Sequence, residues 1–446
     1  MAPRSSKPDL LLRKFGAPLY AAAFPAANYV LVGGGGGKGN HGLKNRIILA
    51  KYGLAAAAPN IAASSKASLT LSDQLAEFTC PEEIRALAMH PSGSLAVAAV
   101  GSLGLVAVGV DVKIDGAEKI TKTDITLPSC GEVKSLAFSA DGAMLAAGTE
   151  DGLVHVWSWP PDASGRPLVE VCAADGGKPH KDGNAIQSVC FSTDGARLLT
   201  SGEDDTAVLW NIAPASSDDK GEAPRAKPIH VYRSAKGGTL KGARFASAGD
   251  AAVDNRIAMC LNRAGVSYAA VFDAESARML HEGKISADPA SSFAASANGR
   301  LLAFGTVEGE LVVVSSDRLI LRRRHKGAHM IFVTGLVFGP SGDTVLSVSA
   351  DAGARVTQLA PASRKWTILL IFMLWLCLLA LSMNPAPFHE GVRWILHKMM
   401  PYHAKVMDER TAAGIAYVKY NHPDPFTLGA TVQSEEQAGG DSGTPQ

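Results

Sequence analysis

The chain has 446 residues, of which 47% are hydrophobic and 19% are charged, and its formal net charge is +1. This length and composition supply a substantial core, and the near-zero net charge gives no bulk field that would favour nucleic acid or an acidic partner. The six cysteines lack paired or metal-ligand spacing, which excludes a disulfide framework and is typical of small core residues in a reducing compartment. They are Cys80, Cys130, Cys172, Cys190, Cys260 and Cys377.

The first apolar segment, Ala17–Val32, follows a basic start and so has some features of a secretory signal peptide. Pro18, Pro25 and Asn28 interrupt it, and no clean cleavage site follows. The pattern therefore favours a first pair of β-strands over a leader.

A glycine-rich loop comes next, with the sequence GGGGGKGNHGLKN over residues 33–45. Two short apolar runs, Val30–Val32 and Ile47–Leu49, flank it and are expected to be strands. Glycine loses more backbone entropy on ordering than any other residue, so five in a row need something that holds them. Carbonyls and amides without side chains are able to wrap an ion or to press against a partner protein. We expect this loop to be the working part of the molecule.

One pattern recurs between residues 17 and 360: an alternating apolar strand, a turn of the type Ser/Pro-x-Asp/Asn/Ser-Gly, a second strand, and then a third. Asp141-Gly142 and Asp194-Gly195 are hairpin signals in its two clearest copies. These copies cover 133–159 and 186–212, weaker copies cover 84–110, 291–314 and 333–359, a degenerate one covers 240–272, and the first, which carries the glycine loop, covers 19–52.

Seven such units, spaced by roughly 43 to 66 residues, predict an all-β, seven-bladed WD-type β-propeller over residues 8–360. Trp157 and Trp210 stand where the repeat has its tryptophan, although Ser158 and Asn211 follow in place of aspartate and no Gly-His pair occurs. A two-domain α+β protein is the competing architecture, disfavoured because helical periodicity is almost absent.

Three insertions rich in small or polar residues are expected to be surface loops between blades: 55–68, 160–182 and 214–228. The basic run Arg322–Lys326 is expected to be a solvated loop that faces lipid headgroups or a partner.

The segment Trp366–Met383 has 18 residues without a charge and predicts one transmembrane helix. Such a helix is about 27 Å long, which suits a thin bilayer such as that of the endoplasmic reticulum. Without an upstream signal, the propeller is expected in the cytosol and residues 384–446 in the lumen, with 433–446 disordered.

The glycine loop does not match the known nucleotide-binding or zinc-binding motifs. It contains G-x-G-x-x-G, but a strand follows where a dinucleotide site needs a helix. Val32 and Gly39 break the spacing of a phosphate-binding P-loop, and His41 has no second ligand at zinc spacing. No catalytic triad or cysteine nucleophile is recognisable, so we expect no enzyme of bond chemistry and no small-molecule substrate. An ion-ordered binding loop and a purely structural long turn remain.

The motif GGGGxGNxGxxN, set between the first two strands of a seven-bladed propeller and followed by one membrane span, resembles the Sec-twelve family. The last repeat, with His329 and the segment Gly339–Asp343, is also similar to that family. The resemblance implies an endoplasmic-reticulum guanine-nucleotide exchange factor for the Sar-type small GTPase that starts COPII coat assembly. A related plant branch, the phosphate transporter traffic facilitators, shares fold and anchor but serves transporter export without exchange. A membrane-anchored propeller that is only a scaffold is a third possibility.

The resemblance also implies site residues. A potassium ion is expected in a turn formed by Gly33, Gly34, Gly35, Gly36, Gly37, Gly39 and Asn40. The GTPase is expected to contact Asn40, His41, Gly42, Leu43 and Asn45, with Asn45 critical for exchange and Lys38 pointing to solvent. Carbonyl and amide oxygens suit a large monovalent ion, whereas a divalent ion would want carboxylates, which the loop lacks.

Overall fold

The structure is a computed structural model that describes residues 12–39, 42–54, 69–112, 118–161, 168–171, 180, 184–212, 226–247 and 255–359. These belong to a compact unit, Met1–Ala362. The predicted transmembrane helix 366–383 and the tail 384–446 lie outside the described residues. Within the described ranges the one helical segment is a single 3₁₀ turn, η1 (Gly101–Leu103), and no helix there is long and apolar enough to cross a membrane.

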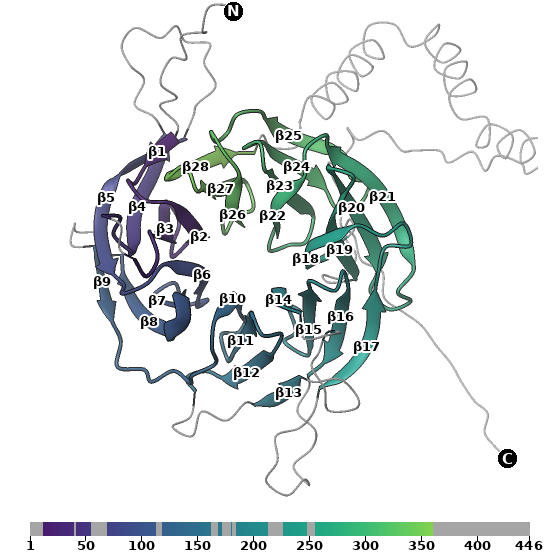
Figure 1. Cartoon of the computed structure of the whole chain (residues 1–446), viewed down its shortest axis with the longest axis horizontal. Coiled ribbons are helices and arrows are strands. Elements are labelled where there is room, and N and C mark those ends of the chain that lie inside the picture. Colours follow the sequence, from purple (N-terminus) through teal and green to yellow (C-terminus); the bar gives the residue numbers. More distant parts are fainter. Residues whose placement is uncertain are drawn as a thin grey trace, which may run out of the picture. The chain divides into compact units, whose positions relative to one another are not determined.

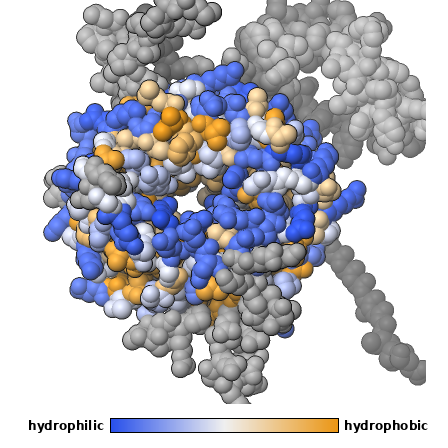
Figure 2. Space-filling model, viewed as in Figure 1, coloured by the Kyte–Doolittle hydropathy of each residue, from blue (hydrophilic) through white to orange (hydrophobic). Residues whose placement is uncertain are grey.

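Seven four-stranded antiparallel sheets form a ring (Figure 1), and the space-filling view shows a central channel in it (Figure 2). Blade one contains β2 (Leu19–Ala23), β3 (Tyr29–Gly34), β4 (Arg46–Leu54) and β5 (Leu69–Thr79). Blade two contains β6 (Ile84–Met89), β7 (Leu95–Val100), β8 (Gly104–Asp111) and β9 (Lys119–Lys122), and blade three β10 (Val133–Phe138), β11 (Met144–Thr149), β12 (Val154–Ser158) and β13 (Val169–Val171). Blade four contains β14 (Ile186–Phe191), β15 (Arg197–Gly202), β16 (Ala207–Asn211) and β17 (Lys227–Tyr232).

Blade five contains β18 (Thr239–Ala246), β19 (Arg256–Arg263), β20 (Val266–Asp273) and β21 (Met279–Ser286), and blade six β22 (Ala290–Ala295), β23 (Leu301–Thr306), β24 (Leu311–Ser315) and β25 (Leu321–His325). Blade seven contains β26 (Val333–Phe338), β27 (Thr344–Ser349), β28 (Gly353–Gln358) and, from the start of the chain, β1 (Leu12–Lys14). The seven-bladed propeller predicted from the repeats is confirmed.

The ring is closed by its own first strand. β1 pairs antiparallel with β28, with Arg13 opposite Ala354, and forms the outermost strand of blade seven. The segment predicted to be either a signal peptide or a strand pair then supplies β2 and β3, so the strand pair is confirmed.

The core lies between the blades. Buried side chains form seven clusters, and each cluster joins two neighbouring sheets. For example, Leu31 and Ile47 of blade one pack with Ile84 and Val108 of blade two. Stacking of the sheets therefore buries both faces of every blade, which no blade achieves alone.

The predicted hairpin turns are present. In blade three, the Ser139 hydroxyl donates to Asp141 and accepts from the amide of Met144, while Gly142 takes a positive φ of 76°. Blade four repeats this arrangement at Ser192–Gly195. The short polar turn is thus a folding signal that the sequence carries explicitly.

Two features differ from the sequence expectation. The three-strand repeat missed the outermost strand of every blade, because those strands face solvent and lack regular apolar alternation. The basic run Arg322–Lys326 is not a loop: Leu321–His325 forms β25 and pairs with β24 along one edge. The degenerate unit 240–272 belongs to a complete four-stranded blade.

A β-bulge near the start of each innermost strand shapes the channel. In all seven blades the register of the first strand pair shifts around one residue, leaving it outside the ladder. The displaced residues are Tyr20, Arg85, Lys134, Gln187, Lys241, Ser291 and Thr334. Six of them line a cavity at one mouth of the channel. The fold therefore presents a ring of side chains at a fixed place.

Candidate functional site

The glycine loop connects β3 to β4 at this same mouth, but it is shorter than predicted. Gly33 and Gly34 belong to β3, where they pair with β2 on one side and with β4 on the other. Their backbone groups therefore lie within sheet ladders, which weakens their predicted part in holding an ion. The loop proper runs from Gly35 to Asn45, and Asn40 and His41 lie outside the described residues.

Close packing explains why this segment needs glycine. A Cβ atom on Gly34 would lie 1.9 Å from the carbonyl oxygen of Pro18, and one on Gly35 would lie 2.0 Å from Oδ1 of Asn45. A Cβ on Gly36 would lie 2.8 Å from the Cβ of Leu43. The two arms of the loop are thus pressed together with no room for side chains, so the loop has a defined shape.

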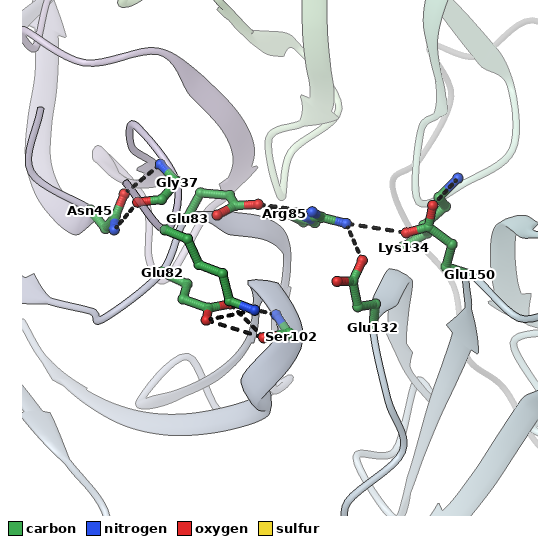
Figure 3. Close-up of polar contacts among 10 residues, drawn as sticks. Gly37, Asn45, Glu82, Glu83, Arg85, Ser102, Glu132, Lys134 and Glu150 are labelled. Carbon is green, nitrogen blue, oxygen red and sulfur yellow. Dashed lines mark hydrogen bonds and ion pairs between the residues drawn. The ribbon is translucent and has the colours of Figure 1, made fainter. Parts of the chain in front are cut away.

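Asn45 fastens the loop from below, and its predicted contact with a GTPase stays a prediction. The residue is only 3% exposed, because it lies under the loop. Its Oδ1 accepts from the amide of Gly37 (3.1 Å), and its Nδ2 donates to the carbonyls of Gly37 (3.2 Å) and of Pro81 (3.0 Å), as Figure 3 shows for Gly37. A buried side chain with these bonds positions the loop.

The exposed part of the loop is its tip. The described residues there that face solvent are Lys38, Gly39, Gly42, Leu43 and Lys44. Leu43 is 36% exposed and is the large apolar side chain of the described part of this tip. The predicted contacts at Gly42 and Leu43 are therefore sterically accessible.

Lys38 points outward, as predicted, but it has a partner. Its Nζ lies 3.5 Å from the Glu82 carboxylate, and the Lys38 side chain stays 69% exposed. The backbone amide of Ser102 donates to Glu82 at 2.6 Å and is the main cause that lowers the pKa of this carboxyl group. Glu82, which precedes β6, therefore ties the loop of blade one to blade two at neutral pH.

The mouth beside the loop is charged on one arc. Arg85 contacts Glu83 (2.9 Å), Glu132 (2.8 Å) and Glu150 (3.2 Å), as seen in Figure 3. Lys134 also contacts Glu150 (3.7 Å) and extends the network to blade four through Glu203 (3.4 Å). Two bulge residues thus hold carboxylates from three blades, and sequence reasoning missed them because the register shift is not visible in the repeat pattern.

The opposite arc is apolar. The segment that enters β26 exposes three large hydrophobic side chains, Met330 (78%), Ile331 (41%) and Phe332 (43%). On the face seen in Figure 2, apolar side chains gather over β22, β26 and β27, whereas hydrophilic ones cover β6, β10 and β14. Phe332 lines the mouth cavity of about 630 Å³ together with Gly35, Gly36 and Gly37. Exposed apolar residues beside a polar rim are typical of a protein-binding surface.

The loop's chemistry fits a weakly hydrated monovalent cation better than a divalent one. The closely packed glycines Gly35 and Gly36 expose backbone groups without side chains, and the loop itself carries no carboxylate, although Glu82 and Glu83 lie beside it. Among the described residues, no cluster of three or more His, Cys, Asp or Glu side chains is placed to hold a metal ion. Such an ion would be held by the backbone carbonyls of Gly35, Gly36, Gly37 and Gly39, of which that of Gly37 also accepts from Asn45.

Comparisons with known proteins agree with the fold and the resemblance. The WD domain, G-beta repeat model matches residues 122–158 and 177–211. The chain is 26% identical to SEC12-like protein 1 of Arabidopsis thaliana over 68% of this chain and 69% of that protein. It is 26% identical to SEC12-like protein 2 of the same plant over 54% of this chain and 56% of that protein.

The crystal structure of the WD40 β-propeller domain of Doa1 superposes with a TM-score of 0.54 at 12% identity, covering 79% of this chain and 96% of that one. At this identity the likeness concerns the fold alone. The predicted resemblance rests on the two plant relatives and on the WD repeats together.

Proposed function

Because the chain is a WD-type propeller of the Sec12 family, we propose that it is a guanine-nucleotide exchange factor for a Sar-type small GTPase, acting in COPII transport from the endoplasmic reticulum. In this proposal the segment Trp366–Met383 anchors the chain in the endoplasmic-reticulum membrane with the propeller in the cytosol.

One observation carries the proposal: a side-chain-poor loop is fixed at the rim of the channel mouth and presents Leu43 to solvent. Asn45 beneath it, and Glu82 beside it, hold this loop to blade two. A loop that is rigid before binding loses little conformational entropy when it enters a partner's nucleotide site. The apolar arc at Met330–Phe332 offers a second contact area at the same mouth.

Exchange by such a surface needs no bond chemistry. If the mouth binds the empty, distorted form of the GTPase more tightly than the nucleotide-bound form, it releases the nucleotide by differential affinity. A potassium ion at the carbonyls of Gly35–Gly37 and Gly39 would stiffen the loop by balancing the mutual repulsion of these oxygens. Leu43 would then meet the GTPase, while Asn45 keeps the loop in place from below.

The decisive experiment uses the compact unit, residues 1–362, with a purified Sar-type GTPase loaded with fluorescent GDP. We expect accelerated nucleotide release, and we expect Asn45→Ala to slow it at least about tenfold, because the loss of 1.4 kcal/mol of loop positioning already corresponds to that factor. Replacing potassium by sodium at constant ionic strength should also slow release.

A matched control exists in blade five. Asn262 has the same kind of bonds as Asn45: its Nδ2 donates to the carbonyl of Ala290 (2.7 Å) and its Oδ1 accepts from the amide of Ala290 (2.8 Å). Asn262→Ala should destabilise the propeller comparably and leave exchange intact. A wild-type unit that gives no acceleration would instead favour the exchange-inactive trafficking relative or the scaffold, and equal effects of the two variants would reduce Asn45 to a structural residue.

A further inference from the structure

The outer edge of blades five and six carries an unusual mixture of basic and aliphatic side chains. β25, the outermost strand of blade six, reads LRRRH, and Ile320 and Leu321 at its start are 49% and 52% exposed. At the start of β21, the outermost strand of blade five, Met279 and Leu280 are 37% and 38% exposed. Exposed cations accompany them: Arg278, Lys284, Arg318, Arg322, Arg324 and Lys326.

These two edges form one surface. The guanidinium of Arg256 contacts Nε2 of His281 in β21 (3.4 Å) and donates to the carbonyl of Asp317 (3.3 Å) in the turn before β25. Arg324 of β25 in turn donates to the carbonyl of Ile285 in β21. Figure 1 shows β21 and β25 next to each other on the circumference of the ring.

Most of the positive charge here is not neutralised. Arg324 lies 3.5 Å from the Glu310 carboxylate and Arg318 interacts electrostatically with Asp317 beside it, but within the described ranges no salt bridge joins Arg318, Arg322 or Lys326 to a carboxylate. Glu282 of β21 is already held by Arg263 (2.6 Å) and Lys236 (2.8 Å). In a chain whose net charge is only +1, this edge is therefore a local positive surface.

Protection of an open sheet edge does not explain this composition. Charged residues on an edge strand prevent pairing with other chains, but such protection also removes exposed aliphatic residues, and here Ile320 and Leu321 remain. Nucleic acid is a poor match, because single-strand sites stack bases on aromatic rings, and the exposed apolar residues of this edge are aliphatic. Exposed cations next to exposed aliphatic side chains suit the headgroup region of an anionic bilayer.

The path of the chain points to the same partner. The amide of Leu359 bonds the carbonyl of Asp343 in blade seven, as the amide of Ser316 bonds that of Arg300 in blade six. Leu359 thus leaves its blade at the same end as the turn into β25, in the neighbouring blade. The predicted span begins seven positions later, at Trp366, a stretch of at most about 25 Å.

We propose that the edge formed by residues 278–284 and 318–326 is a second membrane contact, which binds anionic phospholipid directly and independently of the predicted span. Since the patch lies on the circumference of the ring, a membrane there leaves the channel mouth with the glycine loop open to solvent. The inference goes beyond the exchange function, and its test requires no GTPase.

The test measures flotation of the unit 1–362, which lacks the span, with vesicles of phosphatidylcholine alone or with about one third phosphatidylserine. We expect binding only with phosphatidylserine, and a strong loss between about 0.1 M and 0.5 M salt. Arg318→Gln with Arg322→Gln should weaken binding about 25-fold, because each cation near an anionic surface contributes about a fivefold factor.

The matched control is Lys119→Gln with Lys122→Gln, on the outermost strand of blade two, which lies elsewhere on the ring (Figure 1) and carries two exposed cations. It should bind vesicles like the wild type. Ile320→Ser with Leu321→Ser keeps every charge and should still lower the affinity severalfold. No binding to phosphatidylserine, equal binding to both vesicles, or equal effects of the two charge pairs would overturn the proposal. Retention on immobilised polyglutamate without vesicle binding would assign the edge to an acidic protein instead.

Discussion

The connections between the second and third strands are built in two ways in this propeller. In blades four and seven a short turn closes around a carboxylate. Asp204 accepts from Thr206 (2.7 Å to the hydroxyl) and contacts His180 (3.0 Å), and Asp351 accepts from the amides of Met330 (2.9 Å) and Gly353 (2.7 Å). In blade one the same connection is an eleven-residue loop closed around an amide, that of Asn45.

The hydrogen-bonding groups that each connection offers explain why the loop uses asparagine. A carboxylate accepts hydrogen bonds only, and that suffices for a turn whose amides and hydroxyls point inward. The glycine loop offers one amide and one carbonyl of Gly37, and the next blade offers the carbonyl of Pro81. Only a side chain that both donates and accepts satisfies all three, so an amide is needed where a long loop must be held to a neighbouring blade.

We expect the largest loss of stability from Asn45→Asp. The new carboxylate would face the carbonyl oxygens of Gly37 and Pro81 without a donor of its own, and we expect a loss of about 3–5 kcal/mol of stability at pH 7. Burial and the two acceptors would raise the folded-state pKa of this carboxyl above its unfolded value, so the loss should diminish as the pH falls. Urea unfolding of the unit 1–362 between about pH 4 and 8 measures both effects. This range of about 4 pH units covers the expected titration of the new carboxyl group.

The reverse exchange, Asp204→Asn or Asp351→Asn, should cost less, about 1.5–3 kcal/mol at neutral pH. Burial raises the pKa of both carboxyl groups. For Asp204 the hydrogen bonds from His180 and Thr206, and for Asp351 the nearby His329 ring (3.5 Å) and the amide of Met330, more than offset burial and lower the pKa. A lowered folded-state pKa contributes stability above the unfolded value near 4, and this is lost as the pH falls further. The difference between wild type and these variants should therefore shrink below about pH 4, because the wild type loses stability there. For Asn45→Asp the difference shrinks because the variant gains stability, and it does so at higher pH, around the raised pKa of the new carboxyl group. Losses that shrink over the same pH range for both kinds of variant would refute the distinction.

The smallest effect concerns glycines with positive φ in the two kinds of connection. Gly309 closes the tight turn of blade six with φ 74°, and a Cβ there would lie 2.2 Å from the carbonyl oxygen of His329, so Gly309→Ala should cost about 2–4 kcal/mol. Gly42 in the long loop has φ 80° and open space around it, so Gly42→Ala should cost only about 1 kcal/mol. Thermal unfolding of both variants is the measurement, and equal losses would show that the loop tip is packed as tightly as the turn.

Much of the ring was predictable because its inner strands have a recognisable sequence pattern. Alternating apolar residues and the Asp141-Gly142 and Asp194-Gly195 turns located all seven blades. The closing strand β1 was not predictable, because three residues paired with a strand at the far end of the propeller leave no local signal. His180 was missed for a similar reason. Its ring hydrogen-bonds the Thr200 hydroxyl (2.8 Å), to which Trp210 also donates. It lies within a predicted surface insertion, and the residue directly before it is a proline and not the glycine of the Gly-His pair of WD repeats.

The location of the site was predictable, but the roles of its individual residues were less so. Glycine content located the loop, and the exposure of Leu43 agrees with a contact residue. The role of Asn45 could not be read from spacing, because its burial depends on Pro81, which arrives from the next blade. The bulges that turn Arg85 and Lys134 into the channel arise from sheet register, which a one-dimensional pattern does not encode.

The pairing of β1 with β28 also dictates when the molecule can finish folding. Six sheets can be completed one after another as the polypeptide emerges, but the seventh needs a strand from each extremity of the propeller, so the circle stays open until Gln358 has been synthesised. Until then the backbone hydrogen-bonding groups of Leu12–Lys14 lack the strand β28 with which they pair. A bulky fusion placed directly before Leu12 should therefore slow folding more than it lowers the stability of the folded protein. It would hinder β1, whose pairing partner β28 lies at the other end of the propeller sequence.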